Sequence, residues 1–510
     1  MAFKYQKIVD GVITAINGGL LTGKLDSVRQ YAKHHQVGVS TVTQAYMALE
    51  RQGWIYAKPK CGYFVNHQQG LVSGKRTPNY GKTINRVKAG QSLATAVQFS
   101  FNDPDILPLS CTAPSSVIDH EVLLNRLHRQ VVAKRPYKLF MDSPIEGLDQ
   151  LRYEICRHLS RAGQVLTPDN VLITNGRQDG LLQALMAAKA IGKTVAVESP
   201  VSFYFQAILS QLNIDVVEIP QQMDYQDELD LLSNAYQTQP FETLLVNPSF
   251  ADPTGRVLSD RDKLALIDWA VSHKVTLIEY DRSELYFGRQ RPSCLVALVP
   301  PTSPCKVISI GDFYDTLSPT ISLGYLICCN TFSDCQFTKQ TVGEEASIAL
   351  QLMVHQLMES GQYHKLMSKL REQLVANYIA AQSILAQHLP QALANGLYIS
   401  QPEGGPCIWF KLPNQLSSEA LWQRVIANKL SIAPGQMFTF SHQVDVETDV
   451  QERAQEVAQE PNLETNLETR GYQDCFRITF GLPWTDQMQA GIKRLAQIIE
   501  SYVVESSAQA

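Results

Sequence analysis

The chain has 510 residues, of which 45% are hydrophobic and 18% are charged, and its formal net charge is -5. This length predicts about three domains, and the composition excludes a wholly disordered chain, a collagen and a small disulfide scaffold. No apolar run approaches the length of a membrane-spanning helix, and the N-terminus does not resemble a secretory signal. The ten Cys are scattered without a CxxC pair, so we expect a cytoplasmic protein without a metal site or a membrane partner.

The net charge hides an asymmetry along the chain. Residues 1–67 hold eight Lys and Arg against three Asp and Glu, and residues 68–98 hold five basic residues and no acidic one. The first 98 residues therefore carry +10, and the remainder carries -15. A basic head on an acidic body predicts a polyanionic partner for the head alone.

Three helices are predicted in the head. The first covers 4–18, where apolar residues recur at helical spacing up to Leu20 and Gly18-Gly19 ends the helix. The second covers 27–36, and the third runs from an N-cap at Ser40 to Arg51 with its apolar residues on one face.

Two short strands are predicted after the third helix. The runs 54–56 and 63–65 are rich in aromatic and β-branched residues, and the basic turn between them contains Lys58 and Lys60. Three helices followed by a basic hairpin are the layout of a winged helix-turn-helix, which we assign to residues 1–67.

The stretch GKLDSVRQYAKHHQVGVSTVTQAYMALERQGWIYAKPKCGYFV resembles the DNA-binding head of the GntR family. It is most similar to the version in MocR-type regulators, which join this head to an aminotransferase-like body. The motifs SVRQ, STVTQAY, LE..G and GYFV follow in the family's order, and Asp26 stands where the family usually has Pro.

The head offers a set of candidate DNA contacts. The N-terminal end of a recognition helix meets base edges, and basic side chains on the preceding helix and the wing suit phosphates. The candidates are Ser27, Arg29, Ser40, Thr41, Thr43, Gln44, Lys58 and Lys60. The alternatives are that Ser40 and Thr41 only cap a surface helix and that the wing lysines are merely solvated.

A linker and a large body follow the head. Residues 68–98 are polar, rich in Gly and without periodicity, so we predict a basic linker that either contacts DNA phosphates or keeps the segment soluble. From residue 99 onward short apolar runs alternate with helical stretches, which predicts an α/β body with a doubly wound, mainly parallel sheet. The predicted strands are 171–174, 194–200, 215–220, 243–249, 275–281 and 306–311.

The body, 99–510, is expected to have two parts. The large part covers about 99–380, and the small C-terminal α+β part covers about 381–510, with strands in 405–412 and 475–480. Within the small part, residues 442–471 are acidic and repeat the letters NLET, which predicts a mobile, exposed insertion.

The body resembles a fold-type I aminotransferase from about residue 100 to 500. The matching motifs include EGLDQLR (146–152), ITNGRQDGL (173–181), NPSFADPTG (247–255), FYDTLSPTISLGY (313–325) and FRITFGLPW (476–484). In the family, a Lys of the fourth motif binds pyridoxal phosphate as a Schiff base, and here Asp315 stands at that position. A carboxylate cannot form an imine, so the resemblance implies a degenerate site with no catalytic residue and no covalent cofactor.

Other positions of the pocket differ from the family as well. Asp312 replaces a phosphate-binding Ser and Ser322 replaces an Arg, so the site should repel a phosphate. Arg177 begins the helix whose N-terminal turn normally binds the phosphate, and we expect it to pair with Asp312 or Asp315.

The residues around the cofactor ring have changed too. Asp252 replaces an Asn, Ser283 replaces a Tyr, and Ser202 lies where an aromatic side chain normally stacks on the ring. Asp281 matches the acid that pairs with the pyridine nitrogen, with the alternative that it only caps the end of a strand. Arg477 matches the Arg that holds a substrate carboxylate, and it either binds a small carboxylate effector or forms a scaffold ion pair.

Three functions remain open from the sequence. The first is a transcriptional regulator that binds double-stranded operator DNA, with a body that forms a homodimer and senses an effector. The second is a pyridoxal phosphate-dependent aminotransferase, or a regulator that retains the cofactor noncovalently. The third is a DNA-binding module whose body is only a dimerisation scaffold.

Overall fold

The computed structural model describes residues 4–51, 54–58, 62–66, 93–134, 143–160, 166–440 and 471–507. The chain divides into two compact units, Met1–Arg86 and Val87–Ala510. Among the described residues, no helix combines the length and the apolar character that crossing a membrane requires.

The N-terminal unit is the predicted winged helix-turn-helix. Its elements are α1 (Lys4–Asn17), α2 (Val28–His34), α3 (Val39–Arg51), β1 (Ile55–Lys58) and β2 (Gly62–Val65). The apolar face predicted for α3 is fully buried against its neighbours and consists of Val42, Ala45, Tyr46 and Leu49. The strands β1 and β2 pair antiparallel and form the wing. Helical periodicity therefore located the core of this unit correctly.

Two details of the head differ from prediction. Helix α3 begins at Val39, and the amides of Thr41 and Val42 donate to the Gly38 carbonyl, so Ser40 lies in the first turn and is not the N-cap. Leu20 is 86% exposed, because α1 ends at Asn17 and Leu20 lies beyond the turn that closes the helix. Periodicity alone does not register the point at which a helix stops.

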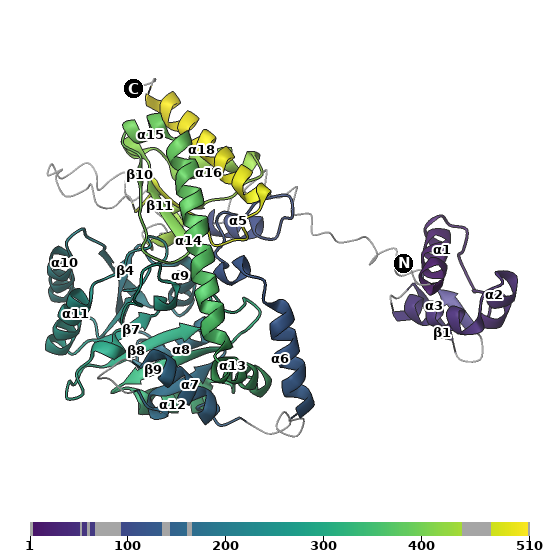
Figure 1. Cartoon of the computed structure of the whole chain (residues 1–510), viewed down its shortest axis with the longest axis horizontal. Helices are drawn as coiled ribbons and strands as arrows, with labels where there is room; N and C mark the ends of the chain where they lie inside the picture. The colour runs from purple at the N-terminus through teal and green to yellow at the C-terminus, as the bar shows by residue number, and fades with distance from the viewer. Residues whose placement is uncertain are drawn as a thin grey trace, which may run out of the picture. The chain divides into compact units, whose positions relative to one another are not determined.

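A seven-stranded sheet forms the centre of the body (Figure 1). Its strands are β3 (Val171–Thr174), β4 (Thr194–Ser199), β5 (Asp215–Pro220), β6 (Thr243–Val246), β7 (Thr276–Tyr280), β8 (Val307–Asp312) and β9 (Gly324–Cys329). The order is β3-β9-β8-β7-β6-β4-β5. Strands β4 to β8 pair in parallel, whereas β9 is antiparallel to both of its neighbours. The mainly parallel sheet is confirmed, but strand β9 was not predicted.

Helices surround the sheet, and α6 packs on α13 rather than on a strand. The helices are α6 (Glu121–Lys134), α7 (Asp149–Leu159), α8 (Arg177–Ala187), α9 (Phe203–Gln211), α10 (Tyr225–Thr238), α11 (Asp260–His273), α12 (Phe332–Val342) and α13 (Ile348–Glu359). Leu181 and Leu185 of α8 are fully buried in one cluster with Leu326 of β9 and Phe205 of α9. The N-terminal end of α8 lies beside the carboxyl end of β7, because Arg177, the first residue of the helix, is 3.5 Å from the hydroxyl of Tyr280, the last residue of the strand.

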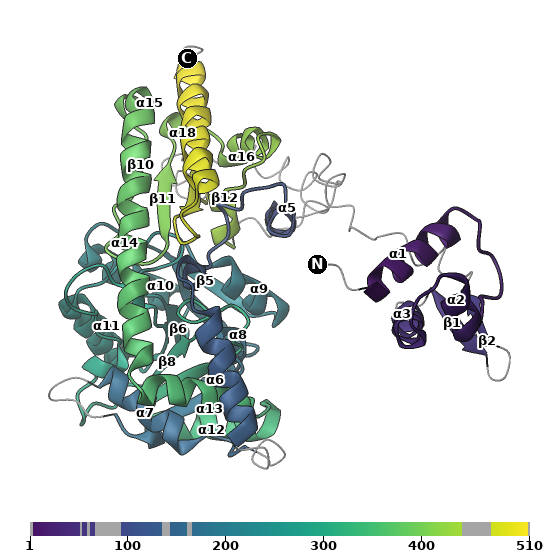
Figure 2. The same cartoon turned by 45° about the vertical axis from the view of Figure 1, so that its right-hand side comes forward.

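The small part contains a second, antiparallel sheet of order β10-β11-β13-β12. The strands are β10 (Tyr398–Ile399), β11 (Cys407–Lys411), β12 (Ala433–Pro434) and β13 (Cys475–Thr479). Its helices are α14 (Gln362–His388), α15 (Pro390–Ala394), α16 (Ser418–Ala427) and α18 (Asp486–Ser507). Helix α14 extends from the large part into the small part and lies beside α18 (Figures 1 and 2).

The predicted boundaries of the body and the linker differ from the structure where it describes them. The division near residue 380 falls inside α14, because one long helix joins the two parts. Residues 93–98 of the predicted linker already belong to helix α5 (Leu93–Ser100), whose Val97 and Ser100 are buried in the body. The rest of the linker up to residue 92, and residues 442–470 of the acidic insertion, lie outside the described residues.

The unpredicted strand offers a test of the core. Leu326 of β9 has no exposed area, so Leu326→Ala should lower the free energy of unfolding by about 2–5 kcal/mol. The control Leu393→Ala, at a site that is 41% exposed on α15, should cost below about 1 kcal/mol. Urea unfolding followed by far-ultraviolet circular dichroism measures both, and equal losses would contradict the central position of β9.

Candidate functional site

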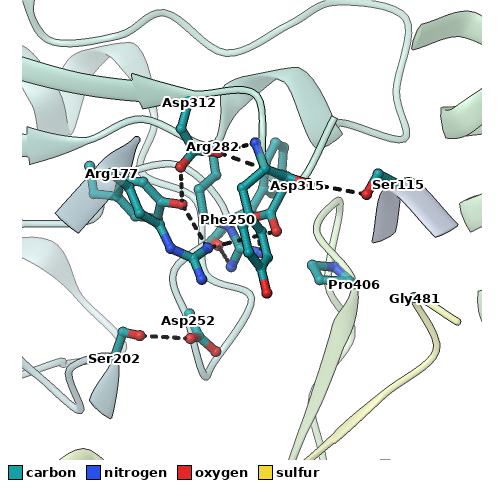
Figure 3. A network of polar contacts seen from close by, with 12 residues as sticks. Ser115, Arg177, Ser202, Phe250, Asp252, Arg282, Asp312, Asp315, Pro406 and Gly481 are labelled. Atoms are coloured by element: carbon teal, nitrogen blue, oxygen red, sulfur yellow. Dashed lines mark hydrogen bonds and ion pairs between the residues drawn. The ribbon is translucent and has the colours of Figure 1, made fainter. Parts of the chain in front are cut away.

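The residues that correspond to a cofactor pocket meet at the carboxyl ends of β7 and β8. The N-terminal end of α8 and the turn after β6 complete the site (Figure 3). Ligands of α/β proteins bind at this edge, because the loops that follow the parallel strands converge there. In this chain the edge holds ion pairs between its own side chains.

Asp315 is paired with an arginine that the sequence did not single out. The Nη2 and Nε atoms of Arg282 donate to Oδ2 of Asp315 at 2.9 and 3.2 Å, and both side chains are at most 7% exposed (Figure 3). A buried carboxylate needs such a cation, since the loss of hydration would otherwise disfavour its charge. Arg282 thus compensates the charge that Asp315 introduces.

Arg177 lies close to both predicted partners. Its Nη1 atom is 3.9 Å from Oδ1 of Asp315 and 3.5 Å from the hydroxyl of Tyr280, which in turn donates to Asp312 at 2.8 Å. The guanidinium also lies over the rings of Tyr204 and Tyr314, at 4.7 and 4.0 Å from their centroids. The predicted pair with Asp315 is present, although Arg282 is the nearer partner, and the contact with Asp312 passes through Tyr280.

Asp312 is held by hydrogen bonds rather than by a direct ion pair. One oxygen accepts from the Tyr280 hydroxyl, and the other accepts from the Tyr314 amide at 2.7 Å. Burial raises the pKa of Asp312 and the nearby Asp315 raises it further, while Arg177 acts in the opposite direction. The protonated form of Asp312 is therefore more accessible than that of an ordinary aspartate.

Asp252 and Arg477 form a second buried pair. The Nη1 atom of Arg477 contacts Oδ1 of Asp252 at 2.5 Å, and the Ser202 hydroxyl donates to Oδ2 at 3.0 Å. Although burial would raise the pKa of Asp252, the positive charges of Arg477 and Arg282 lower it. Of the two predicted roles of Arg477, the structure displays the internal ion pair.

Asp281 and Ser283 lie beside this network and bond to each other. Tyr280 and Arg282 line the small cavity next to Arg177 and Asp252, whereas Asp281 does not. Asp281 accepts from the Ser283 amide at 2.8 Å, and both residues line a neighbouring cavity of about 30 Å³ together with Arg282, Asp312 and Asp315. The contact of Asp281 with the Ser283 amide is the one expected of a cap at the end of a strand, and its match to a cofactor-binding acid stays a prediction.

Strand β7 ends at Tyr280, and Arg282 follows it with φ -114° and ψ 17°, so the period-two alternation of the strand carried no signal for Arg282. Ser322 also lies apart from the network, because its hydroxyl donates to the Asn175 carbonyl at 3.2 Å. It therefore supports the turn before α8 and does not replace the cation that the family has at this position.

Little space remains inside the network. The cavity bounded by Arg177, Asp252 and Arg282 measures about 10 Å³, whereas ligand pockets typically span roughly 300–1,000 Å³. This volume is about that of a single water molecule. No lysine lines this cavity among the residues that the structure describes.

The candidate DNA contacts of the head lie on its surface. Ser40 and Gln44 are exposed at the N-terminal end of α3, and Thr41 and Thr43 are partly exposed. The Thr43 hydroxyl donates to the Val39 carbonyl at 2.9 Å, so the methyl group of Thr43 remains for other contacts.

The remaining predicted contacts divide between α2 and the wing. Ser27 is the N-cap of α2, where its side chain and that of Gln30 form a capping box, and Arg29 of the same helix is exposed. Lys58 is exposed on β1, and Lys60 lies outside the described residues.

Comparisons with known proteins match this organisation. The family model described as aminotransferase class I and II matches residues 116–279. The chain is 23% identical to the uncharacterised HTH-type transcriptional regulator YjiR of Escherichia coli, over 97% of this chain and 98% of that protein. It is 22% identical to the HTH-type transcriptional regulator NorG of Staphylococcus aureus, over 81% and 92% of the two chains.

Solved structures resemble the body. A kynurenine aminotransferase of Pyrococcus horikoshii aligns with a TM-score of 0.67 and 20% identity, over 81% of this chain and 95% of that one. The α-aminoadipate aminotransferase LysN of Thermus thermophilus gives a TM-score of 0.64 at 20% identity, over 85% and 99%. At such identities the likeness concerns the fold, and it confirms the predicted fold class.

The charge network predicts an unequal response to two substitutions. Asp315→Ala should lower the free energy of unfolding by about 3–5 kcal/mol, because Arg282 would stay buried without its carboxylate. Asp105→Ala removes an exposed carboxylate 3.9 Å from Lys429 and should cost no more than about 1 kcal/mol. Urea unfolding of both variants measures the difference, and a mild effect of Asp315→Ala would show that Arg282 does not depend on it.

Proposed function

We propose that the chain is a DNA-binding transcriptional regulator of the MocR type, because it joins a winged helix-turn-helix to an aminotransferase-like body and is similar along its length to HTH-type transcriptional regulators. It acts in the cytoplasm on double-stranded operator DNA. The observation that carries this proposal is the exposed N-terminal end of α3 on the buried core of a winged helix-turn-helix.

The head supplies both kinds of contact that DNA recognition needs. Ser40 and Gln44 provide donors and acceptors for base edges in the major groove. Arg29 on α2 and Lys58 on β1 provide exposed positive charge for phosphates. The positive charge of the first 98 residues adds affinity for any duplex, independent of its sequence.

The body in this proposal carries no Schiff-base chemistry. Asp315 offers no amine, and no lysine replaces it around the described cavity. Arg177 and the two tyrosine rings around it occupy the N-terminal end of α8, where a phosphate would need to approach the amides. These residues do not fit pyridoxal phosphate, so we derive no reaction step through it.

Dimerisation is the role that we propose for the body. A symmetric pair of chains would place two heads on paired half-sites of an operator, which raises both affinity and specificity. An effector would act by binding unequally to different arrangements of the heads. A carboxylate effector at Arg477 would first have to displace Asp252.

The DNA interface can be tested with a fluorescent random-sequence duplex. Arg29→Ala should weaken binding by a few-fold and reduce the slope of log affinity against log salt by about 1, because one phosphate contact is lost. Lys7→Ala, which removes an exposed charge from α1, serves as the matched control. Fluorescence anisotropy across a salt series measures both, and equal slopes for the two variants would contradict the proposed surface.

The cofactor proposal has a spectroscopic test. Purified full-length protein with added pyridoxal phosphate should develop no Schiff-base absorbance band that disappears on borohydride reduction, because the pocket contains no amine. A known fold-type I aminotransferase is the positive control. A reducible band together with a lysine adduct in mass spectrometry would instead favour the aminotransferase alternative.

A further inference from the structure

Apolar side chains run along the exposed side of α3, beside the polar residues Ser40 and Gln44. Val39 and Met47 are 52% and 55% exposed. Thr43 lies midway between them, and its hydroxyl donates to the Val39 carbonyl at 2.9 Å, which leaves its methyl group for other contacts. Residues four positions apart lie on one side of an α-helix, so these three side chains form one row, which we call the apolar stripe.

The apolar stripe does not belong to the core of the head. The residues of α3 that form this core have no exposed area and are Val42, Ala45, Tyr46 and Leu49. Viewed down the helix axis at 3.6 residues per turn, Met47 falls between Thr43 and Ser40, on the side away from the core. A valine and a methionine that stay half exposed leave apolar area in water, which is unfavourable. The apolar stripe is therefore available to a partner.

The charge of the head favours a DNA duplex as this partner. Residues 1–67 hold eight basic residues against three acidic ones, so a second copy of the head would bring like charges together. In the major groove, the base edges present hydrogen-bond donors and acceptors and one apolar group, the 5-methyl group of thymine. An apolar stripe beside two polar residues matches this mixture of groups.

We propose that the apolar stripe of α3 recognises thymine, through contacts of Val39, Met47 and the Thr43 methyl group with 5-methyl groups in the major groove. Ser40 and Gln44 bind the polar base edges beside them. The inference rests on the proposed function, because it requires α3 to enter the groove. The stripe extends over about 12 Å of helix, so each half-site should contain at least two thymines within about four base pairs.

The experiment compares thymine with uracil in one DNA sequence. Random-sequence duplexes are first selected for binding to the full chain, and the selected sequence is then synthesised with either base. Uracil lacks the 5-methyl group and keeps every hydrogen-bonding group of thymine. Each methyl group that is buried on binding contributes about fourfold to the affinity, so the native chain should bind the uracil duplex about tenfold more weakly or worse. Fluorescence anisotropy measures both affinities.

Variants of the stripe should narrow the ratio of the two affinities. Met47→Ala shortens the apolar side chain, and Thr43→Ser removes only the methyl group and keeps the hydroxyl for the Val39 carbonyl. Each should reduce the ratio by about fourfold, whereas Met47→Leu should retain it. Leu20→Ala, at an apolar residue that is 86% exposed beyond the end of α1, is the control and should leave the ratio unchanged.

The salt dependence gives a second readout. Thymine and uracil duplexes carry the same phosphates, so the slope of log affinity against log salt should be equal for both. Unequal slopes would show that uracil changes the docking of the whole head, and they would overturn the inference.

The remaining outcomes separate this inference from the proposed function. Equal affinity for the two duplexes overturns the inference while the proposed function stands. A ratio that survives both Met47→Ala and Thr43→Ser overturns it too, because the effect of the methyl group would then act through DNA shape. So does a change of oligomeric state in Met47→Ala at an unchanged ratio, since the stripe would then join two chains. If the chain selects no sequence and binds no duplex, the proposed function itself is wrong.

Discussion

Two buried ion pairs at the edge of one sheet, Arg282–Asp315 and Arg477–Asp252, have to balance their charges without the help of water. Arg177 and Asp312 lie beside them and are only partly buried, and the Tyr280 hydroxyl contacts both. Burial of a single unpaired member would cost several kcal/mol, so each of these residues is tolerable only in the presence of the others. The arrangement of the strands and helices around this edge is what brings opposite charges within contact distance.

The network explains why the body has the fold of an aminotransferase without its usual chemistry in our proposal. The fold still creates an edge where loops converge, and that edge would normally be a cavity for a ligand. Here Arg177 enters between two tyrosine rings, and Asp252 extends toward Arg477. In our proposal these side chains take the place of a ligand, and the cavity between them has about the size of one water molecule.

The two units place different physical demands on their residues. In the head, the buried face of α3 provides stability, and the exposed end of the same helix is left for recognition. In the body, the residues of the candidate site also stabilise the fold, because the ion pair of Asp252 and Arg477 joins the large part to the small sheet. Substitutions in the body network should therefore lower the stability of the body.

The sequence by itself determined the order of the elements, the buried face of α3 and the parallel strands of the body, because these depend on periodicity and on short apolar runs. It also indicated that Asp315 stands where the family has a lysine. Only the tertiary structure decided which groups meet. The pairing of Asp315 with Arg282 joins the segments that follow strands β8 and β7, and the pairing of Asp252 with Arg477 joins segments 225 positions apart. The antiparallel strand β9 likewise depends on its two neighbours, since a short apolar run carries no sign of its direction.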